Sequence, residues 1–344
     1  MQPLKVGVIG VGRMGQRHCR VYANLRRAQL AGVCDANAQY GRQVAQQYDV
    51  PFYADVDELL ANVDAVSLVT PTPQHFDLAM RCLALGKHVL IEKPITQTLA
   101  QAEQLALAAE ASGLVVQVGH IERFNTAYIE LKNVLENMQV LSANFRRLSP
   151  TEGSNFDVDV VLDLMIHDTN LVLDLMGQEP TWVSAHGLSV FSGTIDHAVA
   201  QLGFATGQLI TVTASRVTEN KIRSIDVTAR QSYVECDLLN KSVLLHRHTI
   251  GEYLNHNHRG VKYRQESIVE RIQIPFFESL FLELQHFVDC VLEGHPSSVA
   301  ARDGLQALRL VDTIRADILR QLVVVDAQAA LPAQPAAPER VLAR

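Results

Sequence analysis

Several features that would assign a sequence to a broad class are missing here. Lysine and arginine form no run, and the formal net charge is −7, so we expect no nucleic-acid partner. No apolar stretch approaches the roughly 20 residues that cross a bilayer, and the N-terminal apolar run is too short for a signal sequence. We therefore expect no membrane partner.

Cysteine is also scarce. The five cysteines are dispersed, and none stands in Cys-x-x-Cys spacing, which is typical of reduced, buried thiols and predicts a cytoplasmic protein. No Cys/His cluster occurs in the sequence, so no metal site is predicted. What remains is an ordinary globular composition, 48% hydrophobic and 19% charged over 344 residues, which is enough for two domains.

The strongest local signal lies near the N-terminus. The short apolar run Lys5–Ile9 predicts a buried parallel strand, and Gln16–Leu25 predicts a helix. A Gly-x-Gly-x-x-Gly turn joins them, and in this context it is the fingerprint of a dinucleotide-binding site. The first glycine permits the tight turn, the second admits the pyrophosphate to backbone N–H groups, and the third lets the helix pack closely. The residues of this turn are the first predicted cofactor contacts: Gly10, Gly12, Arg13, Met14 and Gly15.

Asp35 follows the second predicted strand, Gln29–Cys34, and lies 20 residues after the last glycine of the turn. An acidic residue in this position binds the ribose hydroxyls of the adenosine; the alternative is that Asp35 only caps or turns the chain. A carboxylate about 5 Å from a 2′-phosphate costs roughly 3 kcal/mol at an effective dielectric constant of 20. No arginine follows Asp35 to offset this cost, so the sequence predicts NAD rather than NADP.

Strands and helices alternate over the first 120 residues, which predicts a parallel sheet covered on both faces. Ligands of such sheets bind at the carboxyl ends of the strands. Besides the glycine turn and Asp35, the residues predicted at these ends are Thr70, Glu92, Lys93 and His120. The chemistry is therefore expected on this edge of the sheet.

The pattern changes after this region. Segments of alternating polarity between Trp182 and Thr249 predict an antiparallel meander with one free face, and such a face is often a subunit interface. We therefore expect an α/β Rossmann domain with a parallel sheet over residues 1–121 and an α+β domain with an open, mainly antiparallel sheet over residues 122–325. The Ala/Pro-rich tail, residues 326–344, is expected to be disordered.

A long helix is predicted over Asp157–Met176. Apolar residues surround it except along one line of polar side chains: Asp159, Asp163, His167, Asn170 and Asp174. This line is either a solvent-facing stripe or one wall of a polar cleft, and the lack of Lys, Glu and Arg favours the cleft. A metal site with only two obvious ligands is a third and weaker interpretation. Asp163 and His167 are one turn apart, so we expect a hydrogen bond that orients the imidazole and holds its charged form.

Lys93 lies within Glu92-Lys93-Pro94, at the end of another predicted strand. Beside a nicotinamide ring, its ammonium group could hydrogen-bond a reacting hydroxyl and favour the alkoxide character that develops as hydride leaves. The alternative is an ordinary surface lysine. A cis peptide bond before Pro94 is a hypothesis for how this side chain is aimed.

The order of these motifs resembles the Gfo/Idh/MocA family of NAD(P)-dependent sugar oxidoreductases, over nearly the whole chain up to the tail. The resemblance rests on the glycine turn, Thr70-Pro71 with His75, Glu92-Lys93-Pro94, and Asp163-x-x-x-His167. It implies homodimers or homotetramers formed through the antiparallel sheet. It also implies a catalytic group of Lys93, Asp163 and His167, and cofactor contacts from Thr70, Pro71, His75, Glu92 and Lys93.

Within the family, Gly119–Asn125 and Leu162–Asp168 resemble the UDP-N-acetylglucosamine 3-dehydrogenases of lipid A 2,3-diamino-sugar synthesis. Many members of the family have Gly-Gly ahead of the catalytic aspartate, where Asp159-Val160 stand here. The resemblance implies oxidation of a sugar C3 hydroxyl to a ketone, with hydride passing to NAD. His167 would accept the hydroxyl proton and Lys93 would position the oxygen, or the two would exchange roles.

His120 and Arg123 are further candidates for substrate contacts, together with His167. The fork of donors on Arg123 suits a phosphate; the alternative is a surface arginine at the start of a helix. A transaminase that acts on the 3-keto sugar is implied as a pathway partner by the resemblance alone. Two rival functions remain, namely another NAD(P)-dependent sugar, nucleotide-sugar or inositol dehydrogenase with the same catalytic group, and a non-catalytic NAD-sensing regulator.

Overall fold

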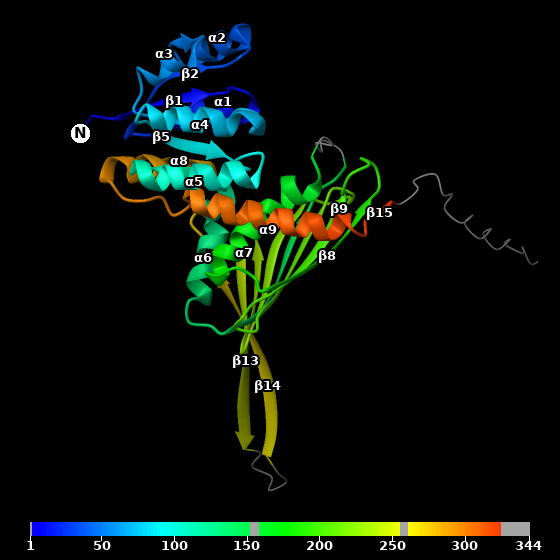
Figure 1. Cartoon of the computed structure of the whole chain (residues 1–344). Helices are drawn as coiled ribbons and strands as arrows, with labels where there is room; N and C mark the ends of the chain where they lie inside the picture. The colour runs from blue at the N-terminus through cyan, green and yellow to red at the C-terminus, as the bar shows by residue number, and fades with distance from the viewer. Residues whose placement is uncertain (1, 152–157, 255–260, 325–344) are drawn as a thin grey trace, which may run out of the picture.

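The computed structural model describes residues 2–151, 158–254 and 261–324. Two lobes are evident in Figure 1, one formed by the blue and cyan first third of the chain and the other built on the long green and yellow sheet. Helices α8 and α9 come late in the sequence but lie where the lobes meet (Figure 1). The predicted disordered tail, residues 326–344, and Asp157 fall outside the described residues.

The first lobe contains a six-stranded sheet in the order β3-β2-β1-β4-β5-β6, and every pairing in it is parallel. This confirms the predicted Rossmann architecture. The strands are Leu4–Ile9 (β1), Ala28–Cys34 (β2), Phe52–Tyr53 (β3), Ala65–Leu68 (β4), His88–Glu92 (β5) and Val116–Gly119 (β6). The helices between them are Arg13–Tyr22 (α1), Ala38–Gln47 (α2), Val56–Leu60 (α3), His75–Ala84 (α4) and Leu99–Ser112 (α5), with a short 3-10 turn at Thr72–Gln74 (η1).

Both faces of this sheet are covered, which explains its nearly continuous apolar strands. Along β5, Val89 and Ile91 pack toward α3, α4 and α5, whereas Leu90 packs toward α1, α2 and α8. Helix α8, Ser279–Glu293, therefore completes the first core although the sequence pattern placed it with residues 122–325. The two domain bounds remain a prediction, and the packing of α8 crosses them.

The second lobe contains a nine-stranded sheet in the order β14-β13-β12-β11-β7-β10-β9-β8-β15 among the described residues. Its pairings are antiparallel except β7 with β10 and β8 with β15, so the predicted open and mainly antiparallel sheet is confirmed. The strands are Val140–Leu148 (β7), Trp182–Ser189 (β8), His197–Gly203 (β9), Leu209–Ser215 (β10), Ile222–Ala229 (β11), Ser232–Asp237 (β12), Ser242–Leu254 (β13), Val261–Ile272 (β14) and Val323–Val324 (β15).

The prediction of a simple meander is wrong in one respect. Strand β7 comes from before the long helix and inserts between β10 and β11, parallel to the first and antiparallel to the second. Alternating polarity gives the face of a strand but not its neighbour. Beyond this body of the sheet, β13 and β14 continue as a two-stranded arm (Figure 1).

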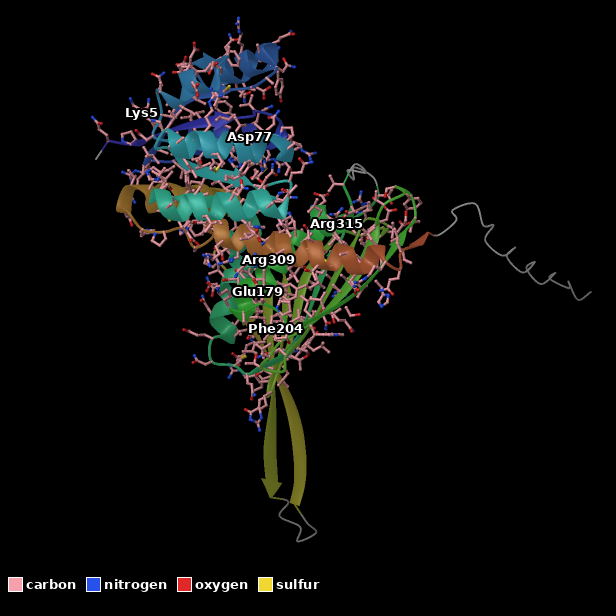
Figure 2. The ribbon with its side chains drawn as sticks, viewed as in Figure 1. Lys5, Asp77, Glu179, Phe204, Arg309 and Arg315 are labelled. Carbon is pink, nitrogen blue, oxygen red and sulfur yellow. The ribbon has the colours of Figure 1, made fainter. Side chains whose placement is uncertain are left out.

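Within the described residues, helices pack on one face of the second sheet, its inner face. Helix α7, Ile166–Met176, and helix α9, Ala301–Leu319, pack on inward-facing residues such as Phe145. Helix α9 also bridges the lobes, because Arg309 forms ion pairs with Glu103 of α5 and with Glu179, which Figure 2 labels beside it. The remaining helical elements of this lobe are Ile121–Phe124 (η2), Thr126–Leu135 (α6) and the π-helical turn Val161–Met165 (η3).

The predicted helix over Asp157–Met176 is therefore shorter and not uniform. It begins at Val161 with the π-helical turn η3 and becomes α-helical only at Ile166. Asp159 precedes it, and its Oδ1 accepts hydrogen bonds from the N–H groups of Val161 and Leu162 at 3.0 Å. Gly177 ends it with φ of 62°. Within the described residues, no helix combines the length and apolar character that crossing a bilayer requires.

Candidate active site

The glycine turn fits a bound dinucleotide. Gly10 has φ of +86°, and a Cβ there would lie 2.7 Å from the carbonyl oxygen of Val69. A Cβ on Gly15 would lie 2.0 Å from the carbonyl oxygen of Gly10, so the close packing predicted for this residue is present. Around Gly12, in contrast, no described atom lies within 4 Å of a built Cβ, which leaves open space at the N-terminus of α1 for a phosphate group.

Asp35 is fixed beside this turn. Its Oδ2 accepts a hydrogen bond from the N–H of Val11 at 2.8 Å, and its Oδ1 accepts one from the N–H of Asn37 at 2.8 Å. The carboxylate therefore links the end of β2 to the glycine turn and also closes its own local turn. Arg13 and Met14 begin α1 next to it. The ribose contact itself remains a prediction.

His75 ties together two loops at the same edge of the sheet. Its Nε2 lies 2.9 Å from the carbonyl oxygen of Thr70, and its Nδ1 lies 3.0 Å from the carbonyl oxygen of Pro94. The ring is 1% exposed, so it holds the Thr70-Pro71 loop against the Lys93-Pro94 loop. The peptide bond between Lys93 and Pro94 is cis, which confirms that hypothesis.

Both carboxylate oxygens of Glu92 have hydrogen-bond partners. Its Oε1 lies 3.1 Å from Nε2 of the fully buried His18, and its Oε2 accepts a hydrogen bond from the N–H of Lys93 at 3.2 Å. A Cβ on Gly119 would meet this carboxylate at 3.1 Å. Sequence reasoning missed His18, although its place on the first helix, three residues after the turn, could have drawn attention to it.

Lys93 meets Asp163 across the two lobes. The Nζ of Lys93 donates to the backbone oxygen of Asp163 at 3.0 Å and to its Oδ1 at 3.1 Å. Both side chains remain partly exposed, at 21% for Lys93 and 35% for Asp163. An ammonium group has three donors, so one N–H of Lys93 is left for a ligand oxygen.

This contact corrects the expected role of Asp163. Among the described residues, the Nδ1 of His167 is buried without a hydrogen-bond partner, and the Asp163 carboxylate binds Lys93 instead. The pKa of His167 lies well below its usual 6.5, chiefly because burial disfavours the imidazolium and then because of the positive charge of Lys93. His167 is therefore a neutral imidazole at neutral pH, not the charged form expected from the helical spacing.

His120 lies in the same group. Its side chain is 2% exposed, and in the described part of the chain neither ring nitrogen has a hydrogen-bond partner. Burial lowers its pKa to about 3, and the charges of Arg123 and Lys93 contribute to this shift. Unpaired polar atoms in the interior are costly, so the two unpaired ring nitrogens keep His120 a candidate for a ligand contact.

Arg123 does not join this group through an open guanidinium. Its Nη2 lies 2.8 Å from Oδ1 of Asp174 and donates to the backbone oxygen of Ser298 at 3.0 Å. Asp159, at the other end of the polar line, pairs with Arg315 at 2.7 Å. The line is thus neither a solvent-facing stripe nor a continuous cleft wall, because partners from other elements bind both of its ends.

A buried ion cluster connects helix α7 to strand β7. The Nε and Nη2 of Arg147 donate to Asp168 at 2.9 and 2.7 Å, and its Nη1 donates to Glu122 at 2.8 Å. Sequence reasoning missed this cluster. The signal was available, since Arg147 shares the inward-facing parity of Ala143 and Phe145 on β7. The cluster fixes Asp168 and thereby the adjacent His167.

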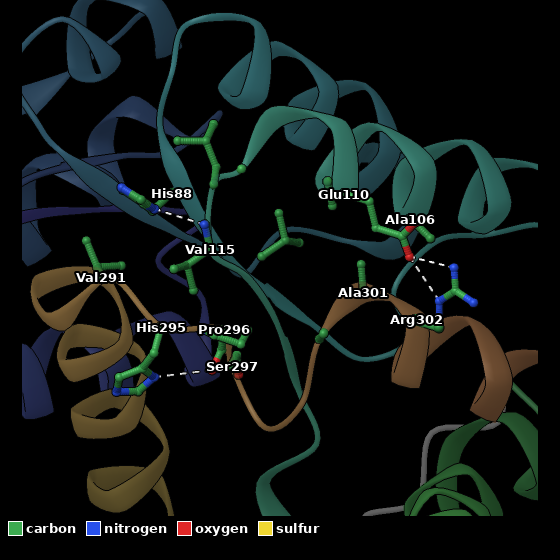
Figure 3. Close-up of a pocket in the computed structure, with 16 residues that line it drawn as sticks. His88, Ala106, Glu110, Val115, Val291, His295, Pro296, Ser297, Ala301 and Arg302 are labelled. Atoms are coloured by element: carbon green, nitrogen blue, oxygen red, sulfur yellow. Dashed lines mark hydrogen bonds and ion pairs between the residues drawn. The ribbon is translucent and has the colours of Figure 1, made fainter. Parts of the chain in front are cut away.

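The described residues hold no group of three or more His, Cys, Asp or Glu side chains that could bind a metal ion. A cavity of about 350 Å³ lies at the opposite, amino-terminal edge of the first sheet, near the start of β5 and β6. Figure 3 shows His88 and Arg302 in its wall, where they contact Val115 and Glu110 respectively. None of the predicted site residues lines it.

Two family profiles match this chain. The profile described as "Oxidoreductase family, NAD-binding Rossmann fold" matches residues 4–120, and the "GFO/IDH/MocA C-terminal domain" matches residues 138–233. The chain belongs to the Gfo/Idh/MocA family and is an NAD-dependent oxidoreductase.

Individual proteins are similar to this chain over most of its length. The UDP-N-acetylglucosamine 3-dehydrogenase of Acidithiobacillus ferrooxidans is 35% identical over 308 residues, covering 88% of this chain and 95% of that protein. A solved structure of this enzyme, GnnA, aligns with a TM-score of 0.83 at 32% identity over 92% of this chain and 98% of that one. The scyllo-inositol 2-dehydrogenase (NAD(+)) of Bacillus subtilis is 28% identical over 321 residues, 88% of this chain and 90% of that protein.

Proposed function

We propose that this protein oxidises the C3 hydroxyl of UDP-N-acetylglucosamine to the 3-keto sugar with NAD. The observation that carries the proposal is the meeting of Lys93 and Asp163 from different lobes beside the neutral, half-buried imidazole of His167. The choice of substrate rests on the relative with 35% identity over most of both chains.

His167 supplies the base in this proposal. A neutral imidazole can accept the C3 hydroxyl proton, whereas an imidazolium cannot, and burial keeps this ring neutral. General base assistance of this kind contributes about 10²- to 10⁴-fold to the rate. NAD, when bound, supplies the acceptor for the hydride from C3.

Lys93 supplies the positive charge. Two of its donors hold Asp163, and the third is directed in our proposal to the C3 oxygen. There it stabilises the negative charge that develops as the O–H bond breaks and the C–H bond gives up its hydride. Asp163 thus serves as a positioning residue for Lys93. His120 offers its open ring nitrogens to the sugar or the nicotinamide.

The second candidate function is oxidation of a free polyol, favoured by the inositol dehydrogenase that is 28% identical. The same catalytic group would serve it, and only the substrate pocket would differ.

The proposed reaction also implies a cellular context. We propose that the enzyme is cytoplasmic and that its 3-keto product passes to a transaminase for lipid A 2,3-diamino-sugar synthesis. Copies of the chain associate in this proposal through the outer face of the second sheet, as homodimers or homotetramers.

A substrate panel tests the proposal. NADH formation would be followed with UDP-N-acetylglucosamine, N-acetylglucosamine and myo-inositol, using wild type and Lys93→Met. We expect turnover of the nucleotide sugar by wild type and its loss in the variant. Oxidation of inositol without oxidation of the nucleotide sugar would refute the substrate, and full activity of Lys93→Met would refute the mechanism. His295→Asn, which changes a half-exposed histidine away from this group, is the control.

A further inference from the structure

A second buried arginine lies beside the reaction group and has no assigned role. Arg223 starts the inward-facing row of β11 and is paired across the sheet with Arg147 of β7. Its side chain is nearly buried, with 8% of the residue exposed. Two guanidinium groups therefore lie next to each other beneath the helix that carries His167.

The two arginines differ in how their donors are used. Arg147 binds two carboxylates, Asp168 and Glu122. Arg223 donates only to neutral oxygens: its Nη1 donates to the backbone oxygens of Leu148 at 2.6 Å and Ile222 at 2.8 Å, and its Nη2 donates to Oγ of Ser149 at 2.9 Å. A guanidinium has five N–H donors, so two remain without a partner among the described residues.

The nearby carboxylates do not supply those partners. Asp168 and Glu122 are hydrogen bonded to Arg147, and Asp163 is bonded to Lys93. They act on Arg223 only through their field, and burial together with Arg147 lowers the pKa of Arg223 to about 10. A buried cation whose only direct partners are neutral is costly unless an anion joins it.

The charge of Arg223 also acts on the reacting group. Its positive charge is among those that lower the pKa of His167, and the Asp163 carboxylate is among those that act on Arg223. Arg123, the arginine that the sequence suggested for a phosphate, is already engaged by Asp174. Arg223, unlike Arg123, has no carboxylate partner within the described residues.

We propose that Arg223 is a specificity-determining residue, and that its two open N–H donors bind the diphosphate of the nucleotide-sugar substrate. This inference rests on the proposed function and deepens it. The planar fork of an arginine matches phosphate oxygens in pairs. A neutral inositol offers no such anion, so Arg223 is the feature that separates a nucleotide-sugar enzyme from a polyol enzyme with the same catalytic group.

Arg223 also has a structural contribution, because two of its hydrogen bonds, to Leu148 and Ser149, join the start of β11 to the end of β7. A purely structural residue would change thermal stability and the binding of all ligands together. A diphosphate-binding residue changes the KM for the nucleotide sugar and leaves NAD affinity and uridine affinity alone. These readouts distinguish the two roles.

The experiment compares wild type, Arg223→Gln, Arg223→Lys and the control Arg230→Gln, which removes an exposed arginine just beyond the other end of β11. Dissociation constants of UDP, uridine and NAD are measured by titration calorimetry, with KM and kcat for UDP-N-acetylglucosamine and the melting temperature. We expect Arg223→Gln to raise the KM and the UDP dissociation constant by about 10- to 100-fold, as for loss of charge-assisted hydrogen bonds. Arg223→Lys should raise them less, and Arg230→Gln should not raise them.

Each outcome bears on one proposal or the other. Unchanged UDP affinity in Arg223→Gln overturns the inference, as does an equal loss of UDP, uridine and NAD binding. If wild type binds UDP with help from Arg223 but does not oxidise UDP-N-acetylglucosamine, the inference survives and the proposed reaction fails. If wild type binds no UDP, the inference fails. If Arg223→Gln does not fold, the test uses Arg223→Lys, which keeps the charge but not the planar pair of N–H donors. Equal UDP affinity in Arg223→Lys and wild type would then contradict the proposal that two donors of Arg223 bind the diphosphate.

Discussion

The two halves of the active site are built from different groups. Around the glycine turn, the fit for a dinucleotide depends on backbone N–H groups and on the absence of a Cβ atom at Gly10, Gly12 and Gly15. Around Lys93 and His167, it depends on the charge and protonation of side chains from separate lobes. The cofactor half should therefore be sensitive to added atoms, and the reaction half to altered charge.

The largest expected effect comes from the reaction half. His167→Asn keeps a polar side chain but removes the base, so we expect kcat to fall about 10²- to 10⁴-fold with the NAD dissociation constant unchanged. Steady-state kinetics and a fluorescence titration with NAD measure the two quantities. A fall of less than tenfold would show that another group takes the proton.

The next largest effect is expected from the Asp35 carboxylate in the cofactor half. Asp35→Asn removes the charge that opposes a 2′-phosphate, an interaction of roughly 3 kcal/mol, or about 100-fold, at an effective dielectric constant of 20. We expect the ratio of kcat/KM with NAD to kcat/KM with NADP to fall toward this limit. Asp77→Asn, at an exposed position on α4, should leave the ratio unchanged. Comparable use of both cofactors by wild type would contradict the role of Asp35.

A pair of glycine variants separates folding from binding in the cofactor half. Gly15→Ala places a methyl group 2.0 Å from a backbone oxygen and should lower the free energy of unfolding by about 1–3 kcal/mol. Gly12→Ala has open space and φ of −59°, so its stability should match wild type while its NAD affinity falls. Denaturant unfolding and NAD titration provide the measurements. Equal destabilisation of both variants would contradict this assignment.

The smallest expected effect is the pH response of wild type between about pH 8 and pH 6. Because the pKa of His167 lies well below 6.5, the base stays unprotonated over this range, and kcat/KM should change less than about twofold. Activity is lost only at lower pH, as the ring takes up a proton. A midpoint near 6.5 in the kcat/KM profile would place His167 in water rather than in a buried site.

Sequence reasoning succeeded where the signal is local. The roles of Gly10 and Gly15 follow from spacing within a single strand–turn–helix unit, and the structure shows the close approaches that they permit. The parallel sheet follows in the same way, because alternating strands and helices leave few arrangements. The cis bond before Pro94 was also anticipated.

Sequence reasoning failed where the residues or strands that contact each other are distant in the chain. Asp163 and His167 stand one helical turn apart, yet Asp163 binds Lys93, 70 residues away. The π-helical turn at Val161–Met165 changes the local geometry on which that expected pairing relied. In the same way, the position of β7 between β10 and β11 depends on long-range pairing, and α8 returns to the first sheet from the far end of the sequence.

The role of Asp163 distinguishes a lysine-centred site from the aspartate–histidine pair suggested by helical spacing, and the pH profile of Asp163→Asn tests it most directly. If the carboxylate serves Lys93, its removal should lower kcat/KM across the pH range and leave the low-pH limb, which reports the protonation of His167, in place. If the low-pH limb moves to lower pH, the carboxylate stabilises the imidazolium of His167, and the role of Asp163 as the positioning residue of Lys93 is contradicted.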